Sequence, residues 1–330
     1  MCIRDSYFLD PDDYTKKADG TNSDAANIDY AGDAMAIVKK IYKKEYKVGN
    51  DRYVYFCERK VDDDFHAVGF NVLGKERDYM LIPMFYGSID SNGKMRSIAG
   101  QWSCLTASGS AADSANGKAI GTAEQYTAIQ AASGKALFFG GALTNTLADI
   151  CILLSKSTDS QTAFGSGMCS TYVEDKAQHY GTKINTVIGG GQFYGSNDNK
   201  SFNKIFHSCV MGSYMLWQRD PYMLLINGRI KVSPDYTYDL TGAKYLDTGV
   251  NLAKNGYYAT TQVVKDFGAV PNDEIACSSA TGYCDYTWVN AEIPAVSLRF
   301  GNCNNGANDG LWARTLNNVA ANAWWNYGAS

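Results

Sequence analysis

Histidine, proline and paired cysteines are scarce in this 330-residue sequence. It has three histidines and six prolines, and none of its nine cysteines forms a Cys-x-x-Cys pair. A closed zinc site needs four clustered Cys or His ligands, so we expect no metal ion and no cofactor. The scattered cysteines fit reduced thiols of a protein made in a cytoplasm, although Cys277 and Cys284 could pair across a loop.

Long apolar runs and positive net charge are also missing. No run approaches the about 18 residues of a membrane-crossing helix, and no apolar signal region opens the chain. We therefore expect no membrane insertion. The net charge is −4, whereas a nucleic-acid-binding domain carries a basic surface, so we expect no nucleic-acid partner.

Catalytic motifs are weak. Ser166 lies directly between two glycines and lacks the Gly-x-Ser-x-Gly spacing of a nucleophile elbow. The glycines of 189–195 lack the Gly-Lys-Ser/Thr end of a phosphate loop. His207 fits a structural histidine in a strand, and Cys169 could meet His179 only through tertiary folding. Because no two features agree on one reaction class, we expect a binding protein rather than an enzyme.

Short apolar runs through the chain predict β-strands. Alternating or continuous apolar residues bounded by turn residues are typical of half-buried or buried strands. The predicted strands cover 53–57, 65–72, 79–86, 185–188, 192–194, 204–211, 223–226 and 229–232. Asn227-Gly228 predicts a type I′ hairpin turn, which needs a positive φ at both central positions.

Two segments have helical character. Residues 122–132 begin with Thr122 as a candidate N-cap and carry Glu124 in the first turn, where it complements the helix dipole. Residues 143–154 place leucines, Ile150 and Cys151 on one helical face, with Thr144 or Asn145 as the candidate cap. Helices among many short strands indicate one α+β domain.

The C-terminal stretch, residues 298–330, combines glycines and large apolar residues with many asparagines. Glycine permits tight turns, while leucine and tryptophan anchor loops to a core. The predicted structural frame is Gly301, Gly306, Gly310, Leu311, Trp312, Leu316, Trp325 and Gly328. The polar side chains between them are expected to point outward: Asn302, Asn304, Asn305, Asn308, Asn317, Asn318, Asn322 and Asn326. On composition alone, an asparagine-rich turn region without function is the simpler interpretation.

This arrangement resembles the variable region of diversity-generating retroelement target proteins. Their C-termini read F/G-G-x-W-x-x-G-x-x-x-G-L-W-x-x-x-L and later W-x-x-G-A, and the frame residues together with Ala329 match that pattern. Cys303 departs from it, because a tryptophan is usual there. In that family, reverse transcription mutates template adenines, so adenine-rich asparagine codons become variable. The resemblance implies further variable positions at Asp309, Ala313, Arg314, Thr315, Trp324 and Tyr327.

Earlier segments are similar to the gut-phage tail members of the same family, at 7–20, 154–159, 193–198 and 283–285 with Trp288. The resemblance implies one C-type lectin-like domain over 7–330, with two helices, small twisted antiparallel sheets and long irregular loops. It implies a protein of the phage tail, assembled in the host cytoplasm, that binds a bacterial surface protein or glycan. Other tail proteins would be partners, and a homotrimer is one possible assembly.

Two other classes of function stay open. A structural tail subunit would use the asparagine-rich end for subunit contacts. An enzyme relative of the formylglycine-generating type shares the fold but would need a reactive cysteine pair. The Glu-Pro-Asn and Trp-Asn-Asp signatures of calcium-dependent sugar binding do not occur in the sequence, so calcium is not implied. We expect alanine at Trp324 or Tyr327 to weaken binding without unfolding the domain, and alanine at Trp312 to unfold it.

The two ends of the sequence carry separate expectations. Residues 1–6, MCIRDS, resemble translated adapter sequence at the start of metagenomic gene models and are left out of the fold. We expect the protein to begin upstream of them. Family members usually continue a few residues beyond the position of Ser330, which would place this end inside or just after the binding loops.

Overall fold

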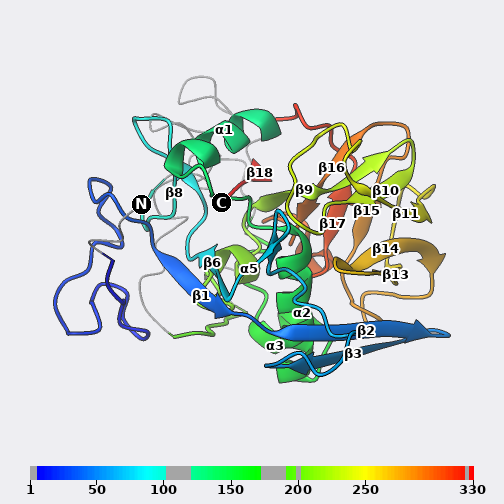
Figure 1. Ribbon diagram of the computed structural model, residues 1–330, viewed down its shortest axis with the longest axis horizontal. Helices are drawn as coiled ribbons and strands as arrows, with labels where there is room; N and C mark the ends of the chain where they lie inside the picture. The colour runs from blue at the N-terminus through cyan, green and yellow to red at the C-terminus, as the bar shows by residue number, and fades with distance from the viewer. Residues whose placement is uncertain (1–5, 102–119, 172–190, 198–201, 324–326) are drawn as a thin grey trace.

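The computed structural model describes residues 6–101, 120–171, 191–197, 202–323 and 327–330 (Figure 1). In chain order, the elements of these ranges are β1 (Met35–Lys39), β2 (Tyr42–Val48), β3 (Asp51–Cys57), β4 (Asn71–Val72), β5 (Lys75–Glu76), β6 (Tyr79–Pro83), β7 (Ser88–Ile89), β8 (Met95–Arg96), α1 (Thr122–Ala132), α2 (Gly141–Ser155), α3 (Ser160–Phe164), α5 (Cys209–Gly212), β9 (Trp217–Ile226), β10 (Arg229–Val232), β11 (Leu246–Asn251), β12 (Gly256–Tyr257), β13 (Ala259–Val264), β14 (Gly268–Ile275), β15 (Thr287–Val289), β16 (Ala295–Arg299), the 3-10 helix η2 (Gly306–Asn308), β17 (Arg314–Leu316) and β18 (Tyr327–Gly328).

The described residues form a mixed α+β structure, as the sequence predicts. Its centre is an eight-stranded sheet in the order β11-β10-β9-β16-β17-β15-β12, with β18 beside β9. Five two-stranded antiparallel sheets surround it. The expectation of small antiparallel sheets alone is wrong, because the central sheet is large and contains two parallel pairs, β15–β17 and β9–β18.

Both predicted helices are confirmed, but their caps differ from the prediction. Gly121 precedes α1, and its backbone N–H donates to the Glu124 carboxylate at 2.8 Å. Gly140 precedes α2, so neither Thr144 nor Asn145 is a cap. Both side chains are instead buried within the helix, where they bond to other elements. A glycine at these ends lets the chain pass close to the backbone of Ala320 and Ala321 in the case of Gly121, and to the Asp220 side chain in the case of Gly140.

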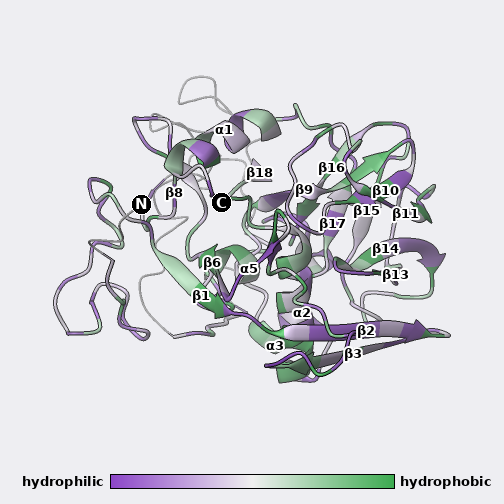
Figure 2. Cartoon of the chain, in the orientation of Figure 1, coloured by the Kyte–Doolittle hydropathy of each residue, from purple (hydrophilic) through white to green (hydrophobic). Residues whose placement is uncertain are grey.

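Helix α2 joins the β2–β3 hairpin to the rest of the fold through buried charges. Asp149 of α2 accepts two bonds from Arg52, each 2.6 Å long, and pairs with Lys43 at 2.7 Å. Glu45 pairs with the same two cations. Burial acts to raise the pKa of Asp149, but Lys43 and Arg52 together hold it below its ordinary value. The inward side of this hairpin is therefore charged, which explains the hydrophilic colour of β2 in Figure 2.

Four of the strand predictions are confirmed in full or in part. Residues 53–57, 223–226 and 229–232 lie in β3, β9 and β10, and 79–86 is a strand as far as Pro83. Asn227 and Gly228 have φ angles of 52° and 75°, as the predicted turn requires.

Three strand predictions are wrong, and one lies outside the described residues. Residues 65–72 form a buried loop that ends in β4. Residues 204–211 turn into α5, because Phe206 and His207 adopt positive φ angles of 53° and 63°, which break an extended strand. Residues 192–194 make only an isolated bridge between Tyr194 and Lys204. The prediction at 185–188 falls on residues that the structure does not describe.

Candidate functional site

The register of the central sheet separates its side chains onto two sides. Thr315 of β17 lies between Trp288 of β15 and Leu298 of β16, and Leu298 in turn pairs with Arg219 of β9. Tyr327 of β18 pairs with Trp217. Paired residues point to the same side of a sheet, as do residues two apart in one strand. All six side chains therefore share one side, while Gln218, Asp220, Arg299 and Arg314 share the side that packs toward α2.

A row of aromatic rings extends the first side. The Trp217 and Trp288 rings meet edge to face at a centroid distance of 5.4 Å. Trp288 contacts Tyr286 at 4.7 Å, and Tyr286 contacts Tyr258 at 5.1 Å. Gly256 makes room for this row, because a Cβ there would lie 2.8 Å from the Tyr286 hydroxyl oxygen. Tyr258, Tyr286 and Trp288 are half-buried, so part of each ring faces solvent.

Asparagines from the C-terminal stretch border both ends of this row. The Tyr258 hydroxyl donates to Asn308 Oδ1 at 2.6 Å. At the other end, Tyr327 donates to Asn318 Oδ1 at 2.5 Å, and Asn322 donates to the same oxygen at 3.2 Å. We call the solvent-facing set the aromatic–asparagine face: Tyr258, Tyr286, Trp288, Asn308, Asn317, Asn318 and Asn322.

Buried residues form the floor of the aromatic–asparagine face. Trp217, Leu298 and Tyr327 make one apolar cluster with Trp288 packed against it. The Arg219 guanidinium lies 5.4 Å from the Tyr327 ring and donates to Thr122 and to the backbone oxygen of Asn322. Burial raises the pKa of Tyr327 to about 12. These buried contacts hold in place the backbone that carries the asparagines of the face.

Two aspartates explain why positions 301 and 310 of the frame are glycines. A Cβ on Gly301 would lie 1.6 Å from Asp309 Oδ1, and one on Gly310 would lie 2.1 Å from Asp285 Oδ1. Asp285 also accepts the backbone N–H of Trp312 at 2.8 Å. Burial raises the pKa of both carboxyls well above the ordinary value. Frame residues Leu311, Trp312, Leu316 and Gly328, with Ala329, are buried, and Gly306 is half-buried.

The prediction that every variable position points outward is wrong for six residues. Ala313, Asp309 and Arg314 are buried in the interior, and Arg314 donates to Asn145 at 2.6 Å. Asn302 is buried in the loop before η2, where its side chain accepts the Asn304 N–H. Thr315 and Tyr327 are buried as well, although they lie on the correct side of the sheet. Within β17, Arg314 and Thr315 point to opposite sides of the sheet, and both sides are covered there.

The remaining predicted positions fall into three groups. Asn308, Asn317, Asn318 and Asn322 belong to the aromatic–asparagine face. Asn304 is exposed and Asn305 half-buried on the adjoining loop, which Gln161 of α3 holds by bonds to the backbone oxygens of Gly306 and Asp309. Trp324, Trp325 and Asn326 lie outside the described residues.

The sequence prediction missed the aromatic half of the face. Tyr258 follows β12, Tyr286 immediately precedes β15 and Trp288 lies in β15, all before the C-terminal stretch begins. Their spacing carries a weak signal, because Tyr286 and Trp288 alternate with Thr287 as half-buried strand residues do. Only the pairing of β12, β15 and β17 shows that they join the asparagines.

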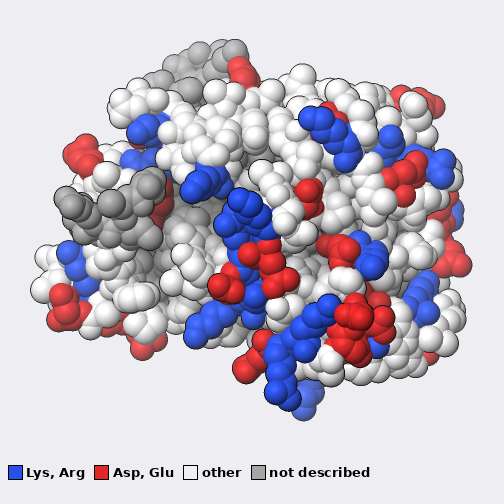
Figure 3. Space-filling model, viewed as in Figure 1, with Lys and Arg blue, Asp and Glu red and all other residues white. Residues whose placement is uncertain are grey.

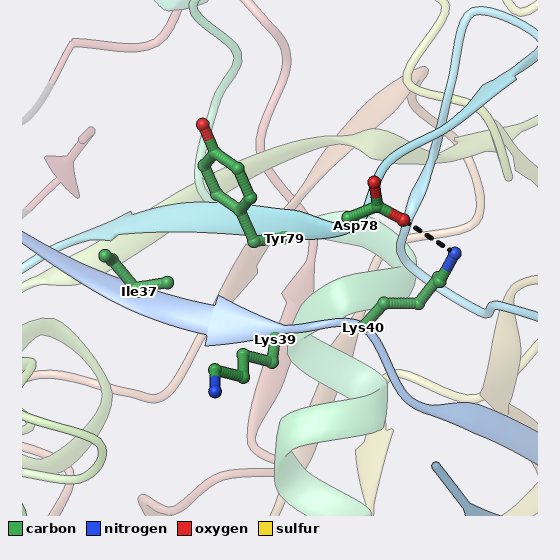
Figure 4. A pocket seen from close by; sticks show the side chains of 5 residues that line it. All are labelled: Ile37, Lys39, Lys40, Asp78 and Tyr79. Carbon is green, nitrogen blue, oxygen red and sulfur yellow. Dashed lines mark hydrogen bonds and ion pairs between the residues drawn. The ribbon is translucent and has the colours of Figure 1, made fainter. Parts of the chain in front are cut away.

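Other candidate sites are weaker. One surface depression, of about 380 Å³, lies on the β1–β6 ribbon and is lined by Ile37, Lys39, Lys40, Asp78 and Tyr79 (Figure 4). The Lys40–Asp78 ion pair at its end measures 3.0 Å. Lys40 and Lys44 pair with several carboxylates, so the charges gathered there and over the β2–β3 hairpin in Figure 3 are largely matched. This depression brings together none of the predicted site residues.

Metal and thiol chemistry find little support in the described part of the chain. No three His, Cys, Asp or Glu side chains cluster there as a metal site would need. Its seven cysteines are free thiols, Cys277 and Cys284 included, and burial raises the pKa of both. His207 is structural, with Nδ1 at 2.8 Å from the Tyr14 hydroxyl, while His179 is not among the described residues. None of the helices described is long and apolar enough to cross a membrane.

The chain matches no protein-family model, and no curated protein matches it either.

Proposed function

We propose that this chain is a ligand-binding protein with a C-type lectin-like fold, and that it attaches a phage tail to a bacterial surface protein or glycan. The aromatic–asparagine face is the contact surface. One observation carries the proposal: the sheet register brings asparagines of the C-terminal stretch beside three half-exposed aromatic rings from an earlier part of the chain. The resemblance to diversity-generating retroelement targets adds that the asparagines are the variable part.

The chemistry of the face suits binding. Tyrosine and tryptophan offer large contact areas at a low cost in conformational entropy, and asparagine amides both donate and accept hydrogen bonds. Asn308, Asn318 and Asn322 already bond to neighbouring side chains, which holds their amides in place. Exchange of such a surface side chain changes what the face can bind, while the buried contact between Trp217 and Leu298 in the floor remains.

Sequencing many copies of this locus tests the diversification. We expect substitutions at Asn304, Asn305, Asn308, Asn317, Asn318 and Asn322, beside an invariant template copy and a reverse transcriptase gene. We expect Asn302, Asp309, Ala313 and Arg314 to stay constant, because their side chains are buried. A uniform C-terminal stretch would instead favour the structural tail subunit.

Binding to cells tests the face directly. The purified full chain, fluorescently labelled, is mixed with a panel of intact gut bacterial strains and bound protein is read by flow cytometry. For a strain that binds, Asn317→Ala and Trp288→Ala should each lower binding at least tenfold. Asn92→Ala, at an exposed asparagine in the turn between β7 and β8, is the matched control and should bind normally. Equal binding by all variants would rule out the aromatic–asparagine face.

A further inference from the structure

Two buried arginines oppose each other on the α2 side of the central sheet. Arg299 of β16 pairs in register with Arg314 of β17, and their side chains are 0% and 2% exposed. Arg299 Nη1 lies 3.5 Å from Asp220 Oδ2. Arg314 donates to Asn145 Oδ1 at 2.6 Å and lies 3.4 Å from the Met223 sulfur. Within the described residues, one carboxylate therefore faces two guanidinium groups.

The neighbouring buried charges do not correct this imbalance. The Lys43, Arg52, Glu45 and Asp149 cluster contains two cations and two carboxylates that neutralise one another. An uncompensated charge in a dry interior is strongly unfavourable. Burial, and after it repulsion from Arg299, hold the pKa of Arg314 well below its ordinary value. One positive charge next to Asp220 thus lacks a counter-ion.

Unused hydrogen-bond donors lie on the same side of the sheet, at paired positions of β9 and β16. Arg299 Nε and Nη2 and the Ser297 hydroxyl have no hydrogen-bond partner among the described residues, and neither has the Gln218 amide nitrogen. Gln218 is the cross-strand partner of Arg299, and Ser297 is the partner of Asp220. All four residues are 0% exposed and share the α2 side of β9 and β16. The groups that lack partners are thus chiefly donors, whereas an acceptor with negative charge is missing.

We infer that this cluster binds a small monovalent anion, with chloride as the simplest occupant. A single-atom anion accepts several N–H and O–H bonds from one position and also supplies the missing negative charge. A water molecule would satisfy donors but would leave the second arginine uncompensated. The site lies on the opposite side of the sheet from the aromatic–asparagine face, so the inference does not depend on the proposed function.

Anion-dependent stability is the test. The full chain is unfolded in urea with sodium chloride replaced stepwise by sodium gluconate at constant ionic strength. An anion that binds only the folded state lowers the unfolding constant roughly tenfold for each tenfold rise in chloride above its Kd. Crystals soaked in bromide should show an anomalous peak within hydrogen-bond distance of Arg299 Nη2 and Ser297 Oγ. Stability that is independent of chloride, or a water at that position, would overturn the inference.

Variants separate the site from general salt effects. Arg314→Met removes the surplus charge, so the chloride dependence should disappear. Ser297→Ala removes only one donor and should weaken the dependence at least threefold, which keeps the test valid if Arg314→Met does not fold. Arg229→Met, at an exposed arginine paired with Asp247, should keep the full dependence. Equal chloride dependence in all three variants would show that the effect arises elsewhere.

Discussion

The two sides of the central sheet differ in how deeply their polar and aromatic side chains are buried, although the same strands supply both sides. The side toward α2 buries Gln218, Asp220, Arg299 and Arg314 almost completely. The other side carries the aromatic–asparagine face, which is half exposed, above a floor centred on Trp217 and Leu298. Polar residues are thus deep inside on one side, and aromatic residues reach solvent on the other.

The difference shows why polarity alone does not identify a variable position. A buried arginine such as Arg314 has a fixed partner in Asn145, so its replacement leaves polar groups unpaired. A surface asparagine such as Asn317 can exchange its partners for water at little cost. Variation is tolerable where solvent supplies the alternative hydrogen bond. Among the predicted variable positions that the structure describes, this holds for the asparagines of the aromatic–asparagine face and its adjoining loop.

The largest effect is expected at Asp220. Asp220→Ala would leave two arginines buried without a carboxylate, and removal of one partner of a buried ion pair costs about 3–5 kcal/mol. Urea unfolding would measure the loss of stability. Arg229→Ala, which breaks the exposed pair with Asp247, serves as the control and should change stability far less. A loss below about 1 kcal/mol for Asp220→Ala would contradict the charged interior.

Tyr327 should behave as part of the floor rather than as a surface contact. Its ring is 8% exposed and packs with Trp217, so Tyr327→Ala is expected to lose about 3 kcal/mol, in line with truncation of a buried aromatic residue. This replaces the sequence-based expectation that alanine there spares the fold. Asn317→Ala should change stability by no more than about 0.5 kcal/mol. Equal losses at the two positions, seen in thermal melts, would remove the division between floor and face.

A smaller effect is expected at Gly310. A Cβ at this position would lie 2.1 Å from Asp285 Oδ1, so Gly310→Ala forces the carboxylate to shift, at a cost of about 2 kcal/mol for overpacking. A double-mutant cycle with Asp285→Ala measures the contact, because the glycine substitution should cost much less once the carboxylate is gone. Additive losses would show that Asp285 is not the obstacle.

The smallest effect concerns pH and Asp285. Burial raises its pKa in the folded state, so its contribution to stability is full below the unfolded value of 3.8 and is lost as pH rises through the folded value. Asp285→Asn keeps an acceptor for the Trp312 N–H and removes this loss. The free energy of unfolding of the variant should therefore increase relative to that of the wild type as pH rises above 3.8. A constant difference between the two proteins from pH 3 to pH 8, in urea unfolding, would contradict the raised pKa.

The candidate site was predictable only in part, and Arg314 and Thr315 show why. Both lie between frame residues Trp312 and Leu316, and the sequence predicts that both point outward. The pairing of β17 with β15 and β16 sends Thr315 toward the aromatic row and Arg314 toward α2. A single sequence shows that neighbouring strand residues point to opposite sides of a sheet. It does not show which side other elements of the fold cover.

Several features of this protein could be predicted from local sequence patterns alone. The extents of α1 and α2, the Asn227-Gly228 turn and the buried frame of Leu311, Trp312 and Leu316 all follow from short-range rules of propensity, turn geometry and apolar burial. The tertiary structure decided which asparagines reach solvent, that Tyr258, Tyr286 and Trp288 join them, and that Arg299 and Arg314 meet inside. These outcomes depend on strand pairing between distant segments, and the energy of such pairing is not contained in any one segment.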